Sequence, residues 1–512
     1  MGKLTALCFI CLMSVSFLSQ ASRVDEYINK YDMQLFYPEA VSMLYPNSQR
    51  QWNSDKAQKD LENQLALLIL ADLNSALENR YYLLQQAIGL EYDILATDTL
   101  IYLLTYQSLI SKKGTSWFFG GRLESHLGEP SPQIITQLHQ AFENKELENI
   151  TQTLPPNSSQ YAALYEQLLS YYDPYHVPVD KMPFSRVIKP NEVLSNQNLL
   201  LRLQVSGELN QEDVERLSQD VNGIYHSELV DIVKQFQTRH GLASDGIIGP
   251  KTIFWLNMSA QERVRIMALN IQRLRLWQDK KNRFVLVNIP SYEMGYWQED
   301  KLLFHSKVIV GKPARKTPLL SSRLDSIVFN PNWKVPIRIM KEDILPKAFN
   351  NQDYLLTHNY EVIPTWRSND VIPLNEIEWD TMTVDNFPYK LRQKSGNSNA
   401  LGRYKFNIPN RNAIYLHDTP SRSLFKKQHR AYSSGCIRVE RASEFAQLLM
   451  KESQFSVQDY KNYHQLPKTN TVGLGKRILV YTIYQTAWVD DKNQIQFRND
   501  IYKYDKWSKS RN

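Results

Sequence analysis

The chain has 512 residues, of which 42% are hydrophobic, 22% charged and 11% aromatic. At roughly 150 residues per domain, this length predicts about three folded domains. The composition excludes a chain that is disordered as a whole, a collagen, a coiled coil and a multi-span membrane protein. The net charge of +7 comes from 60 basic and 53 acidic residues, an excess too small over this length to indicate a nucleic-acid partner.

Residues 1–21 have the pattern of a secretory signal peptide. Lys3 is followed by an uncharged apolar stretch at 4–18, and small residues stand at positions 19 and 21. The alternative is a retained membrane anchor, but the Ser and Thr residues within 4–18 make the stretch weakly apolar for a span of about 20 residues. We therefore expect export, with cleavage after Ala21.

Cleavage would leave one cysteine, Cys436, because the other two, Cys8 and Cys11, lie in the signal segment. A single cysteine can form no intramolecular disulfide, and a free thiol is a liability in an oxidising compartment. The alternative is a buried, inert thiol. In an exported chain the pattern favours a reactive one.

Residues 22–180 predict a helical scaffold domain, since apolar residues recur near every 3.6 positions through 61–84 and 94–110. No nucleophile constellation or metal-ligand pair stands out there. The stretch 174–198 holds four prolines among polar residues, which predicts an extended connector.

A compact unit follows at 199–257. One predicted helical face carries Leu229, Ile232, Val233 and Phe236. Ser227 is the predicted N-cap, Gly241 stands where a left-handed residue ends the helix, and Gly249-Pro250 opens another helix. These residues resemble the small three-helix peptidoglycan-binding domain. The alternative is a helical spacer that has kept the fold and lost the ligand.

From residue 283 the pattern changes to strands. The predicted strands are 284–289, 307–310, 326–329, 403–406, 413–416 and 477–483. Residues 338–399, polar and aromatic, interrupt them and indicate an insertion. An amphipathic helix follows Cys436, with one face formed by Ala442, Phe445, Ala446 and Leu449. Residues 484–512 read as a polar C-terminal tail.

The chemistry centres on Cys436 and on His417, which ends a predicted strand 19 residues earlier. A thiol with an ordinary pKa near 8.5 is mostly protonated at neutral pH, so a cysteine nucleophile needs a base or a cation beside it. The separation allows a strand-loop-strand return that unites ring and sulfur. Gly435 lets backbone N–H groups turn toward an oxyanion. Clustered Cys and His-Glu-x-x-His are missing from the sequence, so we expect no metal and no cofactor.

Residues 283–483 resemble the catalytic domain of the L,D-transpeptidases (the YkuD-type fold), in particular the large Gram-negative branch. The matching residues are His417, Ser433-Ser434-Gly435-Cys436, Thr317-Pro318 and the stretch 330–336. Ser434 replaces the histidine usual before Gly-Cys. The resemblance implies an α+β multidomain chain with a mostly β catalytic domain, in which 338–399 forms a capping subdomain.

The resemblance also assigns roles, residue by residue. It makes Cys436 the nucleophile, His417 the general base and Asp418 the residue that orients the base, by its carbonyl or by its carboxylate. It places the oxyanion and the substrate beside Ser434, Gly435, Arg438, Tyr415 and Trp333. Arg438 would hold a substrate carboxylate as a planar fork.

Each role has an alternative. Arg438 is alternatively a structural ion-pair residue, Trp333 a core residue and Asp418 the start of a turn. His429, seven residues before Cys436, is the rival base.

The implied activity is peptidoglycan 3→3 cross-linking in the periplasm, with a tetrapeptide stem as acyl donor, diaminopimelate as acceptor and D-Ala as leaving group. Carbapenems would acylate the cysteine, and other cell-wall synthases are candidate partners. The alternatives are a non-catalytic wall-binding protein, an L,D-carboxypeptidase that uses water, and a papain-like peptidase. The last is disfavoured because papain-type enzymes place the cysteine before the histidine. If the signal segment is retained, the protein is anchored in the inner membrane.

Overall fold

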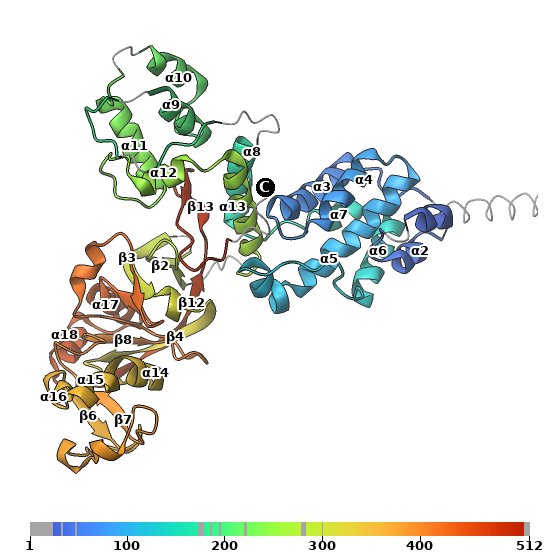
Figure 1. Ribbon diagram of the computed structural model, residues 1–512. Coiled ribbons are helices and arrows are strands. Elements are labelled where there is room, and N and C mark those ends of the chain that lie inside the picture. Colours follow the sequence, from blue (N-terminus) through green and yellow to red (C-terminus); the bar gives the residue numbers. More distant parts are fainter. Residues whose placement is uncertain are drawn as a thin grey trace, which may run out of the picture. The chain divides into compact units, whose positions relative to one another are not determined.

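The computed structural model describes residues 24–31, 34–46, 49–172, 179–184, 187–193, 196–219, 223–277, 283–299 and 301–505. The expected signal segment at 1–21 lies outside these residues. The chain divides into two compact units (Figure 1). The first comprises residues 1–279 together with 486–512, and the second comprises 280–485.

The first unit begins with a bundle of helices, as the sequence predicts. They are α2 (Pro38–Leu44), α3 (Asp55–Leu70), α4 (Ala76–Gln86), α5 (Leu90–Phe118), α6 (Pro132–Asn144), α7 (Leu147–Thr151) and α8 (Ser159–Tyr171), joined later in the chain by α13 (Ala260–Leu274). The apolar run at 61–84 is not one helix, because a turn containing Asp72 at φ 55° separates α3 from α4. Every residue of α5 from Tyr92 to Tyr106 is buried, so α5 is the central helix of the bundle.

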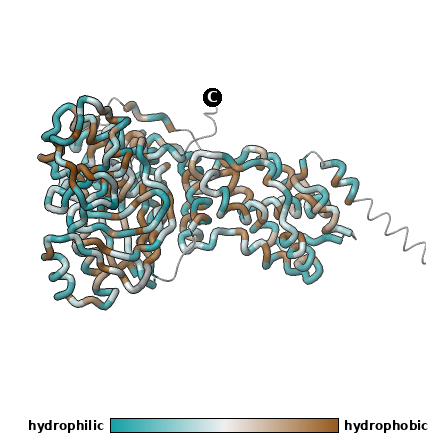
Figure 2. The backbone as a smooth tube through the Cα atoms, turned by 90° about the horizontal axis from the view of Figure 1, so that it is seen from below, coloured by the Kyte–Doolittle hydropathy of each residue, from teal (hydrophilic) through white to brown (hydrophobic). Residues whose placement is uncertain are grey.

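Hydrophobic and hydrophilic residues alternate along the chain trace (Figure 2). Within the described residues, we find no helix that combines the length and the apolarity needed to cross a bilayer.

Four helices form the small domain expected at 199–257. They are α9 (Asn196–Val205), α10 (Gln211–Ser218), α11 (Ser227–Arg239) and the short α12 (Pro250–Leu256). His226 is the N-cap of α11 and Ser227 its first residue, so the helix begins one position earlier than predicted. Gly241 has φ 62°, and Gly249 is the N-cap of α12 with Pro250 in its first turn, as the sequence indicates.

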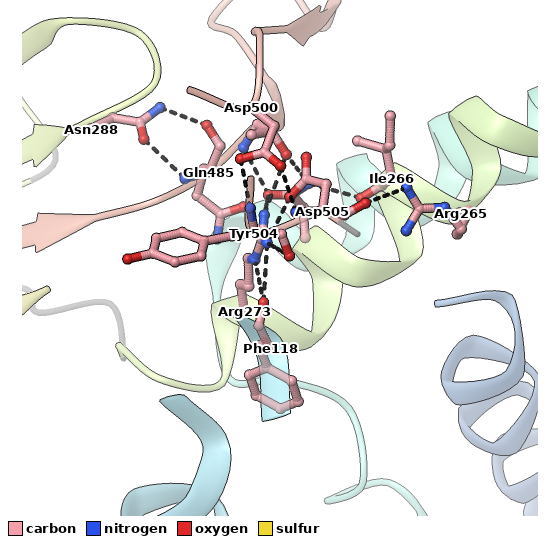
Figure 3. Close-up of polar contacts among 11 residues, drawn as sticks. Phe118, Arg265, Ile266, Arg273, Asn288, Gln485, Asp500, Tyr504 and Asp505 are labelled. Carbon is pink, nitrogen blue, oxygen red and sulfur yellow. Dashed lines mark hydrogen bonds and ion pairs between the residues drawn. The ribbon is translucent and has the colours of Figure 1, made fainter. Parts of the chain in front are cut away.

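The C-terminal residues return to the first unit. They form a hairpin of β13 (Ala487–Val489) and β14 (Ile495–Phe497). Phe497 is fully buried, with its ring 5.5 Å from His240 and 5.9 Å from Trp255 between centroids. Arg273 on α13 donates to the Phe118 carbonyl at 3.0 Å and pairs with Asp505 at 2.7 Å (Figure 3). Part of the expected tail is therefore folded structure.

The second unit is built on one sheet with the strand order β10-β3-β11-β9-β8-β4-β12-β1-β2. Because β2 also pairs with β3, the sheet closes on itself. Its strands are β1 (Phe284–Asn288), β2 (Glu293–Gln298), β3 (Lys301–Gly311), β4 (Leu320–Phe329), β8 (Tyr404–Asn407), β9 (Leu416–His417), β10 (Ala431–Ser433), β11 (Ile437–Val439) and β12 (Asn470–Ile483). Five of the six predicted strands lie in this sheet, whereas the strand predicted at 413–416 shares only Leu416 with β9. Strands β2, β10 and β11 were not predicted.

Helix α17 (Ala442–Glu452) covers the core of this sheet. Its four predicted inward residues are each at most 1% exposed. The Phe445 ring lies 5.2 Å from Phe304 and 4.9 Å from Phe406, so apolar burial fixes the helix that follows the candidate nucleophile. Helix α18 (Val457–Gln465) comes next in the chain.

The insertion at 338–399 has a hydrophobic core of its own, which includes Met340, Leu355 and Leu391. A three-stranded sheet joins β5 (Trp333–Lys334), β7 (Lys390–Gln393) and β6 (Tyr360–Ile363) in that order. Its helical elements are α14 (Ile337–Ile339), the π-helix η2 (Met340–Ile344), α15 (Leu345–Asn350), α16 (Asp353–Thr357) and the 3-10 helices η3 (Leu374–Glu376) and η4 (Trp379–Thr381). The insertion is thus a subdomain rather than a loop.

Candidate active site

Strand register brings the candidate residues to one face of the sheet. His417 on β9 pairs with Lys405 on β8 and with Arg438 on β11. Paired residues point to the same side of a sheet, and side chains alternate along a strand. Cys436 directly precedes β11, and the Ile437 N–H bonds the Tyr415 carbonyl at 3.1 Å. The register therefore places the cysteine opposite Tyr415 and diagonally next to His417.

His417 is buried, at 5% exposure, and its backbone neighbour orients it. Its Nδ1 lies 2.6 Å from the carbonyl oxygen of Asp418, which can only accept, so Nδ1 carries the proton and Nε2 is the basic nitrogen. The Asp418 carboxylate serves elsewhere, since it accepts from the Arg403 N–H at 2.9 Å and lies 3.3 Å from Arg422. Of the two modes of orientation that the sequence left open, the structure has the carbonyl.

The charge state of the ring follows from its surroundings. Burial, and after it the positive charges of Arg438 and Lys405, lowers the pKa of His417 to about 3, against the opposing effect of the Asp418 carbonyl. The ring is therefore neutral at physiological pH, which is the form that a general base requires.

Cys436 is a partly exposed free thiol in surroundings that disfavour its charge. Burial raises its pKa above the ordinary value, while the Tyr415 backbone and hydroxyl and the charges of Lys405 and Arg438 oppose the rise. The Sγ lies 3.9 Å from the Ala413 carbonyl. The resting site thus holds a thiol and a neutral imidazole, not a preformed ion pair.

Tyr415 links the cysteine to the insertion. Its hydroxyl accepts from the Trp333 indole N–H at 3.1 Å, and burial, followed by the charge of Cys436, raises the pKa of Tyr415. Trp333 is only 9% exposed and is part of the insertion core. It is therefore a core residue, the alternative that the sequence left open, and it borders the site as well. Lys405 lies over the Tyr415 ring, 4.5 Å from its centroid.

Arg438 carries a positive charge that the fold leaves uncompensated. Its Nε is buried without a hydrogen-bond partner, and across the part of the chain that the structure describes no carboxylate lies within ion-pair distance of it. Burial lowers its pKa, while Cys436 raises it. This arrangement argues against Arg438 as a structural ion-pair residue. It leaves the Arg438 guanidinium able to bind an anionic ligand.

The loop before the nucleophile is held by hydrogen bonds. The Ser433 Oγ donates to the Cys436 carbonyl at 2.5 Å and accepts from the Gly435 N–H at 3.1 Å. Gly435 has φ 119°, a conformation that side-chain-bearing residues rarely adopt. The Gly435 N–H is therefore engaged within the loop. Ser434 is exposed, and its Oγ accepts from Arg315 at 2.8 Å.

Two residues of the site were not found from the sequence. Lys405 lies in a predicted strand. The alternation of that strand, together with its pairing to His417, would have been the signal that places Lys405 at the site. Arg315 lies between two strands and carries no sequence signal.

The rival base His429 has its Nδ1 3.0 Å from the Tyr292 hydroxyl. In the described parts of both units, no group of three or more His, Cys, Asp or Glu side chains could hold a metal ion.

Comparison with known proteins shows what this domain is similar to. Residues 282–457 match the family model for the YkuD L,D-transpeptidase catalytic domain. This part of the chain is thus similar to the YkuD family. Residues 191–256 match a model described as "Putative peptidoglycan binding domain". The α+β multidomain architecture expected from the sequence is likewise confirmed.

Two known proteins are similar to this chain. A Haemophilus influenzae protein named "Putative L,D-transpeptidase" is 41% identical over 241 residues, which are 47% of this chain and 48% of the relative. The match thus spans about half the length of each protein. The crystal structure of an L,D-transpeptidase (Yku) from Stackebrandtia nassauensis is 13% identical, covers 59% of this chain and 97% of its own, and has a TM-score of 0.21.

Proposed function

We propose that the chain is a peptidoglycan L,D-transpeptidase that forms 3→3 cross-links through a thioester on Cys436. The observation that carries the proposal is the juxtaposition of Cys436 with a neutral, carbonyl-oriented His417 on one face of a YkuD-type sheet. The match of residues 191–256 to a peptidoglycan-binding domain supports murein as the polymer that both domains meet.

The first half-reaction is acyl transfer to the enzyme. His417 Nε2 takes the thiol proton as the Cys436 sulfur attacks the carbonyl of the third stem residue, diaminopimelate. The Cys436 N–H stabilises the oxyanion that forms. The bond to D-Ala then breaks, its nitrogen receives the proton from His417, and D-Ala leaves a thioester behind.

The second half-reaction reverses these roles. The side-chain amine of diaminopimelate on another stem attacks the thioester carbonyl and loses a proton to His417. The C–S bond breaks, the sulfur is reprotonated and a 3→3 cross-link remains. If water attacks instead, the product is a tripeptide and the activity is that of an L,D-carboxypeptidase.

Stem peptides are anionic, and the uncompensated charge of Arg438 suits one of their carboxylates. Lys405 adds a second positive charge at the same face. We assign Tyr415 and Trp333 to the wall of the donor groove, where their hydrogen bond fixes both rings. We also propose that residues 1–21 direct export to the periplasm.

Incubation of the mature chain with disaccharide-tetrapeptide, followed by mass spectrometry, tests the proposal. We expect a dimer linked 3→3 with loss of D-Ala, and a single carbapenem adduct on Cys436. His417→Ala should slow adduct formation by about 10²–10⁴-fold, the usual worth of a general base, while His429→Ala should not. A wild-type chain that forms neither dimer nor adduct yet binds murein would instead be a wall-binding protein.

A further inference from the structure

Arg315 holds two parts of the catalytic unit together. It ends the 3-10 helix η1 (Pro313–Arg315), in the connection from β3 to β4, and its side chain is 6% exposed. On one side its guanidinium pairs with Glu342 and Asp343, which lie on η2 of the insertion. On the other side it donates to the Ser434 Oγ at 2.8 Å, two residues before Cys436. One side chain thus joins the insertion to the nucleophile loop.

The same connection holds the loop at two further points. The Lys312 N–H donates to the Ser433 carbonyl at 2.9 Å, and the Thr317 Oγ1 donates to the Gly435 carbonyl at 2.8 Å. These contacts fix the backbone before and after Ser434. The bond from Arg315 fixes Ser434 itself. Of these three contacts, only the one from Arg315 comes from a side chain that also pairs with the insertion, so only this contact depends on where the insertion lies.

The carboxylates make this arginine a strong but separable link. Charge-assisted bonds from a guanidinium to carboxylates are about twice as strong as neutral ones and define a geometry. Glu342 and Asp343 are 46% and 39% exposed, so water can solvate them when the arginine is absent. Both stand on a π-helix, an irregular element that is frequent at functional sites.

We propose that Arg315 is a positioning residue that couples the capping insertion to the oxyanion loop, so that the Cys436 N–H is aimed when the insertion is in place. This inference rests on the proposed function. It predicts a loss in the chemical step of acylation rather than in donor binding, because Arg315 contacts the loop and not the face that carries Arg438 and Lys405.

The test measures carbapenem acylation of the mature chain at several drug concentrations by intact mass. This separates the limiting rate from the apparent dissociation constant. For Arg315→Ala we expect a limiting rate lowered by about tenfold or more, a scale set by the loss of one oriented oxyanion contact, with little change in the dissociation constant. Arg315→Lys should fall between, since an ammonium cannot reach three partners as a fork.

Arg338→Ala is the matched control. Arg338 donates to the same Glu342 at 2.7 Å but is 62% exposed and lies in α14. It should acylate like the wild type. If Arg315→Ala and Arg338→Ala have equal limiting rates, or if only the dissociation constant changes, the inference is wrong.

Ser434→Ala keeps the proposal testable if Arg315→Ala does not fold. This change removes only the acceptor on the loop, so we expect a smaller loss in the same limiting rate with an unchanged melting temperature. An unchanged limiting rate in Ser434→Ala overturns the inference. A wild-type chain that is never acylated contradicts the proposed function instead, which keeps the two failures apart.

Discussion

At the scale of single residues, the proposed catalytic pair is uncharged at rest. The pKa of His417 is lowered to about 3 and that of Cys436 is raised, in both cases chiefly by burial. Between these values a neutral imidazole and a thiol share one face of the sheet, so in the proposed reaction proton transfer would accompany attack rather than precede it. Such a site protects the Cys436 thiol from oxidation, because the thiolate is the reactive species.

The thiol should therefore react slowly with alkylating agents near neutral pH. A pKa raised above the ordinary value leaves the thiolate a small minority at pH 7, and its fraction grows as the pH rises. We expect the iodoacetamide rate of Cys436 to climb steadily from pH 6 through pH 9, measured by intact mass. A plateau below pH 7, as a thiolate-imidazolium pair gives, would contradict the neutral pair.

Asp418 offers a second test at this scale, since its carbonyl and its carboxylate have separate partners. Asp418→Asn keeps the carbonyl and an oxygen for the Arg403 N–H, and it loses only the pair with Arg422, which is 64% exposed. Exposed pairs contribute about 0–1 kcal/mol. We expect carbapenem acylation within about threefold of the wild type. A loss of about a hundredfold or more would make the carboxylate part of the mechanism.

At the scale of elements, the register of β8, β9 and β11 builds the site. The Cys-His spacing predicted a strand-loop-strand return that brings Cys436 and His417 together, and the register of β9 and β11 places the two residues on one face of the sheet. Strand order was not predictable. Nothing in residues 301–311 indicates that β3 pairs with β2, β10 and β11, since these pairings depend on contacts distant in sequence.

The turn before β8 makes a further prediction. Gly402 has φ 60°, and a Cβ there would lie 2.4 Å from the Asp418 carboxylate. Gly402→Ala adds about 1–2 kcal/mol of backbone strain and pushes on the residue whose carbonyl orients His417. We expect a lower melting temperature of the catalytic unit together with slower carbapenem acylation.

Gly396→Ala is the control for this prediction. Gly396 also has positive φ, at 144°, but a Cβ there meets nothing within 4 Å. Strain alone should lower stability without slowing acylation. Equal acylation rates in the two variants would show that the position of Asp418 does not govern the base.

At the scale of the whole molecule, the chain leaves the first unit near residue 279 and returns to it at 486. The sequence predicted the helices and the peptidoglycan-binding motif of this unit, because the residues that mark each of them lie close together in the chain. It did not predict the return. The segment 484–512 is polar in composition, and its few apolar residues gain their burial only against helices hundreds of positions earlier.

Phe497 is the residue on which that return depends most. Its buried ring packs on His240 and Trp255, and the Arg263 guanidinium lies 5.3 Å from its centroid. Phe497→Ala should cost about 3–5 kcal/mol through lost burial and the cavity left behind. Calorimetry should show the melting temperature of the first unit fall, whereas Phe254→Ala, at a ring that is 50% exposed, should change it little.

Carbapenem acylation of Cys436 should persist in both variants, because the second unit has its own core. If acylation fell along with the stability of the first unit, the two units would fold as one, and the return of the chain would serve the active site as well as the scaffold.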